Sequence, residues 1–310
     1  MSGVGSTEPP EAEAPALPVP ERETRESVLD LLERVWGERP DRRELEWWFD
    51  ESPAGPGLLT VERDGERAVG LASLSYLRCR VAGRDQLVAM PLQVATDPAA
   101  RGKGIFGRLE RANEKEAAAR GCELGITFPN DASRPIFLER LGWHELWRGR
   151  IWVRPPAVRS RRGALRIEAL TEGQALGHVY SRHVPGTVPQ ANGQLADADF
   201  LEWRYLRSPR AYRVLGAFDG ERLEGLIAWR PSRGRVAVVC HALGEVAQLL
   251  RSTGSARPTI ALVPRQQRGA FLAAGFLPTP KPIRVLGKKL RPEGSLDGPW
   301  QFQLGDFDVF

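Results

Sequence analysis

The stretch that decides the fold of this chain is Asp97-Pro98-Ala99-Ala100-Arg101-Gly102-Lys103-Gly104-Ile105-Phe106-Gly107. Glycines at positions 102 and 104 let the backbone approach an anion without clashes from Cβ atoms. The apolar spacing after Gly104 predicts a helix, and the amides of its first turn are donors at the positive end of the helix dipole. Arg101 and Lys103 add positive charge. The stretch therefore predicts a cradle for phosphate groups.

Two other interpretations of this stretch fit its context less well. Residues 102–107 also match the dinucleotide-binding pattern GxGxxG. A nicotinamide site needs a βαβ unit and an acidic residue after the next strand, whereas antiparallel strands are expected before this loop and Asn130 follows the next strand. A plain glycine turn would require both glycines and both cations to be accidental. A nicotinamide oxidoreductase stays an alternative to the phosphate cradle.

Hydrophobic spacing and turn residues on both sides of the loop predict an ordered series of elements. Two short helices come first, followed by three antiparallel strands with turns at Asp64-Gly65 and Ala82-Gly83. After the loop come a helix, a strand, a helix that Gly142 ends, and a strand. The expected helices are 25–36, 41–49, 105–120 and 131–141, and the expected strands are 58–63, 68–81, 86–96, 123–128 and 147–153.

The second half runs through a similar order, which indicates an internal duplication. The sequence Ile136-Phe137-Leu138-Glu139-Arg140-Leu141-Gly142-Trp143 is echoed by Ala270-Phe271-Leu272-Ala273-Ala274-Gly275-Phe276. The expected strands are 165–170, 212–218, 223–230, 235–242 and 259–263, and the expected helices are 172–182, 197–206, 245–252 and 266–274. We therefore expect an α/β (α+β) protein with a tail at 1–22 and domains at 23–155 and 156–310.

The sequence resembles the GNAT superfamily of N-acetyltransferases. The family's donor loop, Q/R-x-x-G-x-G/A, falls on residues 99–104, and its later Asn, small residue and Gly-aromatic pair fall on Asn130, Ser133 and Gly142-Trp143. The resemblance covers residues 23–155 well and the second half weakly. It implies two tandem GNAT-like domains, each a mixed, mostly antiparallel sheet flanked by helices, with a degenerate second copy.

The resemblance also implies a donor, acetyl-CoA or another acyl-CoA, and a metal-free site. Main-chain groups of Leu92, Gln93 and Val94 would pair with the pantetheine arm, and Asn130 and Ser133 would contact it from the other wall. An equally good interpretation makes Asn130 or Asp131 the N-cap of the next helix. The residues expected around the donor pyrophosphate are Arg101, Gly102, Lys103, Gly104, Ile105 and Phe106.

Two positions depart from the family pattern. Ala99 stands where Gln or Arg is preferred, and Leu138 stands where many members carry a Tyr that protonates the leaving thiolate. An apolar side chain cannot be a general acid. The expected function is transfer of an acyl group to a primary amine, on a small molecule or a peptide. The alternative is a non-catalytic acyl-CoA-binding or regulatory module.

The second half has no counterpart of the glycine loop, since residues 241–245 hold one glycine and no cation. In tandem members of the superfamily the degenerate copy shapes the acceptor pocket. Two interpretations of its aromatic-rich positions stay open, an acceptor pocket in which Arg204 holds an anionic group, or packing at a domain interface. The residues concerned are Trp203, Arg204, Tyr205 and Trp229.

The C-terminus carries one more hypothesis. Residues 300–304 alternate as in a strand. Some two-copy members, such as the protein N-myristoyltransferases, use the terminal carboxylate as a base, so the carboxylate of Phe310 is a candidate catalytic group. In the alternative, an edge strand completes the second sheet and leaves Asp306 and Asp308 solvated.

Composition narrows the class of protein. The 310 residues are 42% hydrophobic and 27% charged, and no apolar run is long enough for a membrane span. The N-terminus has no signal-peptide pattern, and Cys79, Cys122 and Cys240 show no metal or disulfide spacing, so we expect reduced, partly buried thiols and a cytoplasmic location. The net charge of +5 reflects Arg throughout the chain. The basic run 154–166 is more typical of a solvated linker than of a nucleic-acid site.

Overall fold

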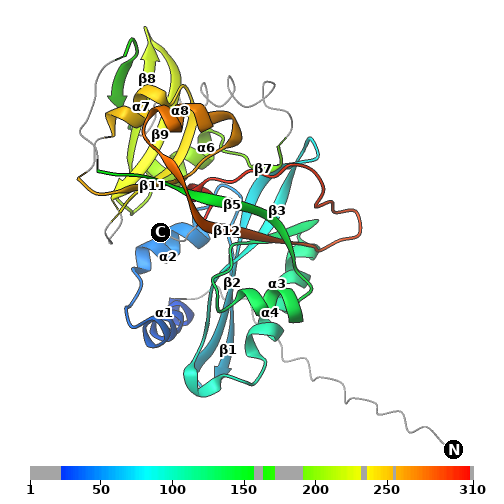
Figure 1. The fold of residues 1–310 in the computed structure, drawn as a ribbon. Coiled ribbons are helices and arrows are strands. Elements are labelled where there is room, and N and C mark those ends of the chain that lie inside the picture. Colours follow the sequence, from blue (N-terminus) through cyan, green and yellow to red (C-terminus); the bar gives the residue numbers. More distant parts are fainter. Residues whose placement is uncertain (1–21, 157–162, 172–190, 232–235, 254–255, 308–310) are drawn as a thin grey trace, which may run out of the picture.

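Figure 1 shows the fold as a computed structural model, which describes residues 22–156, 163–171, 191–231, 236–253 and 256–307. Almost all of the expected N-terminal tail lies outside the described residues. The helix expected at 172–182 and the terminal residue Phe310 also lie outside them.

The first half folds in the predicted order. Asp41 begins the second helix because its side chain accepts a hydrogen bond from the amide of Arg43. The helices are α1 (Arg22–Trp36), α2 (Arg42–Asp50), α3 (Ile105–Ala119) and α4 (Arg134–Arg140), with a 3-10 turn η1 (Pro98–Ala100). The strands are β1 (Leu58–Asp64), β2 (Arg67–Val81), β3 (Arg84–Thr96), β4 (Leu124–Thr127) and β5 (His144–Arg154).

From residue 198 onward, the described elements of the second half follow a similar order of three strands, a helix, a strand, a helix and a strand, with shorter helices. The single helix expected at 197–206 is a short helix, α6 (Ala198–Leu201), followed by a π-helical turn, η2 (Glu202–Leu206). The strands are β6 (Arg166–Ala169), β7 (Gly193–Gln194), β8 (Arg213–Asp219), β9 (Arg222–Pro231), β10 (Ala237–Gly244), β11 (Thr259–Leu262) and β12 (Leu277–Lys289). The remaining helices and 3-10 turns are α7 (Ala247–Ser252), η3 (Arg265–Gln267), α8 (Arg268–Ala273) and η4 (Leu304–Asp306).

The described strands form one sheet in the order β1-β2-β3-β4-β12-β5-β11-β10-β9-β8-β6, and β7 pairs with β2. The pairs β3–β4 and β10–β11 are parallel, and the other pairs are antiparallel. Helices flank this sheet, so the expected mixed and mostly antiparallel α/β fold is confirmed (Figure 1).

The centre of the sheet is built by an exchange of strands between the two halves. β12, from the end of the chain, lies between β4 and β5, while β5, from the first half, lies between β12 and β11 (Figure 1). The sequence analysis missed β12 because Pro278, Pro280 and Pro282 have no N–H for the ladder. The strand accommodates them where its register against β5 shifts, between Pro278 and Pro282.

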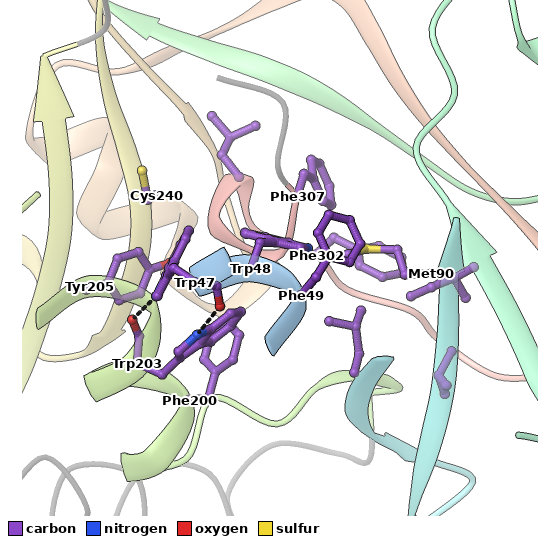
Figure 2. Packing of buried hydrophobic residues seen from close by; sticks show 14 of the residues in the cluster. Trp47, Trp48, Phe49, Met90, Phe200, Trp203, Tyr205, Cys240, Phe302 and Phe307 are labelled. Atoms are coloured by element: carbon purple, nitrogen blue, oxygen red, sulfur yellow. Dashed lines mark hydrogen bonds between the residues drawn. The ribbon is translucent and has the colours of Figure 1, made fainter. Parts of the chain in front are cut away.

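The largest core cluster spans both halves. Figure 2 shows Trp47 and Trp48 from α2 packed beside Phe200 and Trp203 from the second half. The three cysteines are free, as expected, but they are buried more completely than the expected partial burial. None of the described helices is both long enough and apolar enough to cross a membrane.

One expectation in each half was wrong. Residues 301–303 form no strand, and Trp300 makes only an isolated bridge with Asn192, because Gln303 and Asp306 cap each other and turn the chain into η4. Asp306 is therefore buried instead of solvated. Arg154, expected in a solvated linker, is also buried, and it donates to the main-chain oxygens of Leu250 (2.6 Å) and Thr253 (2.8 Å).

Candidate acyl-donor site

A cleft opens where β3 and β4 separate. The two strands pair only through Val88 with Leu124 and Ala89 with Gly125. Beyond these pairs, the hydroxyl of Thr127 donates to the main-chain oxygen of Pro91 over 3.1 Å and closes the narrow end. A cavity of about 390 Å³ begins there and follows both strands. We call it the β3–β4 cleft.

Five residues that the sequence analysis placed on a pantetheine arm line this cleft. They are Leu92, Gln93, Val94, Asn130 and Ser133. The β2–β3 ladder shifts register between the pairs Ser73–Leu92 and Leu71–Ala95, and Gln93 there has a φ of +46°. Such a bulge re-aims the main chain, and strained backbone of this kind gathers at functional sites.

The glycine loop lies between β3 and α3. Gly102 and Gly104 have φ values of +80° and +70°, a left-handed conformation that L side chains rarely adopt. A Cβ atom at Gly102 would meet nothing within 4 Å, so the loop has open space on that side. Arg101 and Lys103 are exposed beside it. Glycines, cations and a helix N-terminus therefore meet, as predicted.

The side chains of Ile105 and Phe106 have structural roles. Ile105 is buried against Leu109 and Val69. The ring of Phe106 packs edge-to-face on Phe137, with centroids 5.4 Å apart, and Phe137 lines the β3–β4 cleft. The loop and the cleft therefore adjoin each other through these two rings.

Asp97 fixes the start of the loop. Its side chain accepts from the amide of Ala99 over 3.0 Å, from Arg67 over 2.6 Å and from Arg34 over 3.2 Å. The Ala99 amide and then the Arg67 and Arg34 guanidinium groups lower the pKa of Asp97. The sequence analysis missed this residue, although an Asp before Pro is a common start of a turn.

Arg108 fixes the other side of the loop. It donates to the main-chain oxygen of Lys103 over 2.5 Å and pairs with Glu62 on β1 over 2.5 Å. The carbonyl of Lys103 is therefore engaged by a cation. No local sequence pattern indicates this contact, because Glu62 and Arg108 are far apart in the chain.

The far wall of the cleft starts with a capped turn, since the N-cap of α4 itself is Ser133. The side-chain oxygen of Asn130 accepts from the amides of Ala132 (3.0 Å) and Ser133 (2.9 Å). Asn130 thus caps the turn before α4 and also lines the cleft. Leu138, at the family's Tyr position, is 39% exposed, and Phe137 is the α4 residue whose ring faces the cleft.

Among the described residues of the second half, Arg210 and Phe307 line the cleft. Arg210 pairs with Glu44 over 2.9 Å, and both line it together with the exposed Trp36. Phe307 packs on Phe128, with ring centroids 3.4 Å apart (ring of Phe307 in Figure 2). Phe310, the predicted catalytic residue, lies outside the described residues.

Arg204 and its aromatic neighbours are packing residues. Arg204 is 2% exposed and donates to the main-chain oxygens of Gly305 (3.1 Å) and Phe307 (3.0 Å). Its guanidinium group lies over the rings of Trp48 and Tyr212. The interpretation as a domain-interface cluster is supported, because Arg204 is buried and its guanidinium group donates to Gly305, Tyr212 and Phe307.

A larger cavity, of about 900 Å³, lies over β5 and β12. Its lining includes Trp147, Arg150, Arg265 and Phe302 but no residue of the glycine loop or of the β3–β4 cleft. Size alone does not make it the chemical site, since the strand gap, the bulge and the cradle all lie elsewhere.

Comparison with known proteins agrees with this geometry. Residues 20–146 match the family model described as an acetyltransferase (GNAT) domain. This matched part, less than half of the chain, is therefore similar to a GNAT acetyltransferase domain. No curated protein matches it in sequence.

Solved structures with the same fold cover most of the chain. A probable N-acyltransferase from Enterococcus faecalis V583 is 12% identical with a TM-score of 0.67, over 89% of this chain and 72% of that one. A GCN5-related N-acetyltransferase from Kribbella flavida is 18% identical with a TM-score of 0.65, over 89% and 72%. The Saccharomyces cerevisiae N-myristoyltransferase with bound myristoyl-CoA and inhibitors is 9% identical with a TM-score of 0.62, over 91% and 81%. These likenesses establish the fold.

Proposed function

We propose that this protein transfers an acyl group, acetyl or another, from acyl-coenzyme A to a primary amine. The observation that carries the proposal is the continuity of two features. The anion cradle at residues 101–107 adjoins the β3–β4 cleft, through Phe106 on Phe137. A donor with a pyrophosphate at one end and a long amide-bearing arm at the other fits that arrangement.

In this proposal the cradle binds the pyrophosphate through the amides at the start of α3, with Arg101 and Lys103 as counter-charges. The pantetheine arm runs along Leu92, Gln93 and Val94 towards the narrow end of the cleft. The thioester then lies near Pro91 and Thr127, because the strands converge there.

The amine attacks the thioester carbonyl carbon, a C–N bond forms, and the C–S bond breaks. Phe137 and Leu138 cannot protonate the thiolate. A thiolate is a good leaving group, so we propose that positioning supplies most of the acceleration. Glu44, held by Arg210, is the one carboxylate in the described lining of the cleft.

The terminal carboxylate of Phe310 remains our proposal for the base that accepts the amine proton. Its support is the course of the chain, because Phe307 already lines the cleft three residues before the end. The acceptor would approach from the side of Trp36 and Arg210.

We also propose that the chain is a tandem duplication with its boundary near residue 156. The strand order supports this. On one side of the sheet, the meander β1-β2-β3 is followed by the parallel pair β3–β4 and then by β12 from the second half. On the other side, the meander β8-β9-β10 is followed by the parallel pair β10–β11 and then by β5 from the first half. The second half, which lacks a cradle, would shape the acceptor side.

A thiol-release assay tests the proposed function. Acetyl-CoA and longer acyl-CoAs are combined with a panel of small-molecule and peptide amines, and free thiol is followed over time. Steady release that depends on the amine is expected. Coenzyme A binding without turnover for any pair would favour the alternative, a non-catalytic acyl-CoA-binding module.

A further inference from the structure

The second half contains a strand gap of its own. β10 and β11 pair in parallel only up to Val239 with Ala261, as β3 and β4 pair only up to Ala89 with Gly125. β10 then continues to Gly244, whereas β11 ends at Leu262. The following Val263-Pro264 stands where Phe128-Pro129 follows β4.

The chain's own C-terminal segment, residues 303–307, lies along the edge of β10 that β11 leaves. The amide of Ala242 donates to the side-chain oxygen of Gln303 over 2.9 Å, and its carbonyl accepts from Gln267 over 3.0 Å. Since β9 pairs with one edge of β10, these two hydrogen bonds are made at the other edge, which faces the gap. A Cβ at Gly305 would collide with the hydroxyl of Tyr205 and the main-chain oxygen of Cys240.

The segment is held firmly in this place. Residues 302–307 are all buried. Arg204 donates to the oxygens of Gly305 and Phe307, and Asp306 accepts from the amide of Gln303 over 2.7 Å. Side-chain and main-chain groups of the protein thus take the places that a donor's arm would take in a functional copy.

The anchored segment delivers Phe307 to the first cleft. The ring of Phe307 packs on Phe128, the residue that follows Thr127 at the narrow end. The acyl group of a donor in that cleft would point at this end. Phe302 packs on the same Phe128 with centroids 5.4 Å apart, but it lines the other cavity.

We propose that residues 303–307 are a built-in occupant of the second gap, and that they place Phe307 as the wall that limits acyl length in the first. The inference rests on the proposed function. It assigns a specificity role to Phe307 and positioning roles to Gln303 and Arg204, and it predicts one donor per chain.

Calorimetry with coenzyme A, acetyl-CoA and hexanoyl-CoA tests the proposal. Wild type is expected to bind one equivalent of each, with acetyl-CoA preferred over hexanoyl-CoA. Phe307→Ala should raise the relative affinity for hexanoyl-CoA about tenfold, the scale expected when an apolar pocket gains room for extra methylenes. Phe307→Leu should give a smaller change in the same direction.

Phe302→Ala is the matched control, because it removes a ring that packs on the same partner and does not line the cleft. Gln303→Ala, which loosens the segment, should relax the preference partly while leaving the affinity for coenzyme A itself unchanged. An equal shift in Phe302→Ala, an unchanged preference in both Phe307 variants, or two donors per chain would overturn the inference alone. Failure of wild type to bind coenzyme A would overturn the proposed function as well.

Discussion

Trp47 and Trp203 hydrogen bond to each other's main chain. The indole N–H of Trp47 donates to the oxygen of Trp203 over 3.0 Å, and that of Trp203 donates to the oxygen of Trp47 over 3.2 Å (dashed lines in Figure 2). Their rings stack with centroids 5.0 Å apart. Both follow a Leu-Glu pair, at 45–46 and 201–202, so the contact joins equivalent positions of the proposed duplication.

Trp203→Phe is expected to destabilise the protein by about 1–3 kcal/mol, because it leaves the buried oxygen of Trp47 without its donor. Urea unfolding measures this. Trp36→Phe is the control, since Trp36 is 47% exposed, and it should change stability by less than about 0.5 kcal/mol. Equal effects of the two substitutions would show that the reciprocal contact contributes nothing.

A fragment that ends at Pro156 should be insoluble or inactive. It lacks β12, so the edge of β4 that faces away from β3 and the facing edge of β5 would both be unpaired at the centre of the sheet. A chain that begins at Arg22 keeps every described element and should behave like the full chain in size-exclusion chromatography and in the thiol-release assay. A soluble, fully active fragment 22–156 would contradict the exchange of strands.

Glu110 should make stability fall as pH rises. Its side chain is fully buried on α3, and neither carboxylate oxygen has a hydrogen-bond partner among the described residues. Burial and, to a smaller extent, the charge of Glu114 raise the pKa of Glu110 from 4.5 to about 8, while Lys288 has the opposite effect. The folded state then binds more protons than the unfolded state between these pH values. Its contribution is fully present below about pH 4.5 and is lost as pH rises towards 8.

Glu110→Gln removes this titration. The free energy of unfolding of the variant, relative to wild type, should therefore increase from pH 4.5 to pH 8. Urea unfolding at several pH values gives the difference directly. A difference independent of pH would mean that Glu110 is already ionised in the folded protein.

Arg101→Ala should weaken coenzyme A binding by about 1–2 kcal/mol, as expected for an exposed charge-assisted contact with a phosphate. Arg150→Ala, on the rim of the other cavity, is the control and should bind normally. An effect of Arg101→Ala confined to the KM of the amine would move Arg101 to the acceptor side.

The donor loop could be predicted from sequence because its features are local. Gly102, Gly104 and the cations beside them need no distant partner to be recognised, and the helix that follows has its own periodicity. β12 could not be predicted, since its prolines argue against a strand and only the gap between β4 and β5 stabilises it.

In the C-terminal segment, by contrast, the sequence predicts a strand that does not form. Residues 300–304 alternate as a strand does, but the mutual capping of Gln303 and Asp306 and the bonds from Arg204 turn the chain into η4. Asp97 and Arg108 were missed because their partners Arg34, Arg67 and Glu62 come from other elements. The local sequence pattern therefore identifies the glycine loop, but the contacts that hold it in place come from residues far away in the chain.

The most direct measurement of the central claim is thermal stabilisation by coenzyme A, in wild type and in Gly102→Glu. A Cβ atom at Gly102 would meet no neighbour within 4 Å, so we expect a Glu side chain there to enter the open space beside the cradle and repel the pyrophosphate. Gly65→Glu, at another exposed glycine with positive φ and nothing within 4 Å, controls for backbone strain. We predict that coenzyme A raises the Tm of wild type and of Gly65→Glu but leaves the Tm of Gly102→Glu unchanged. An equal rise in all three proteins would contradict the assignment of the donor site.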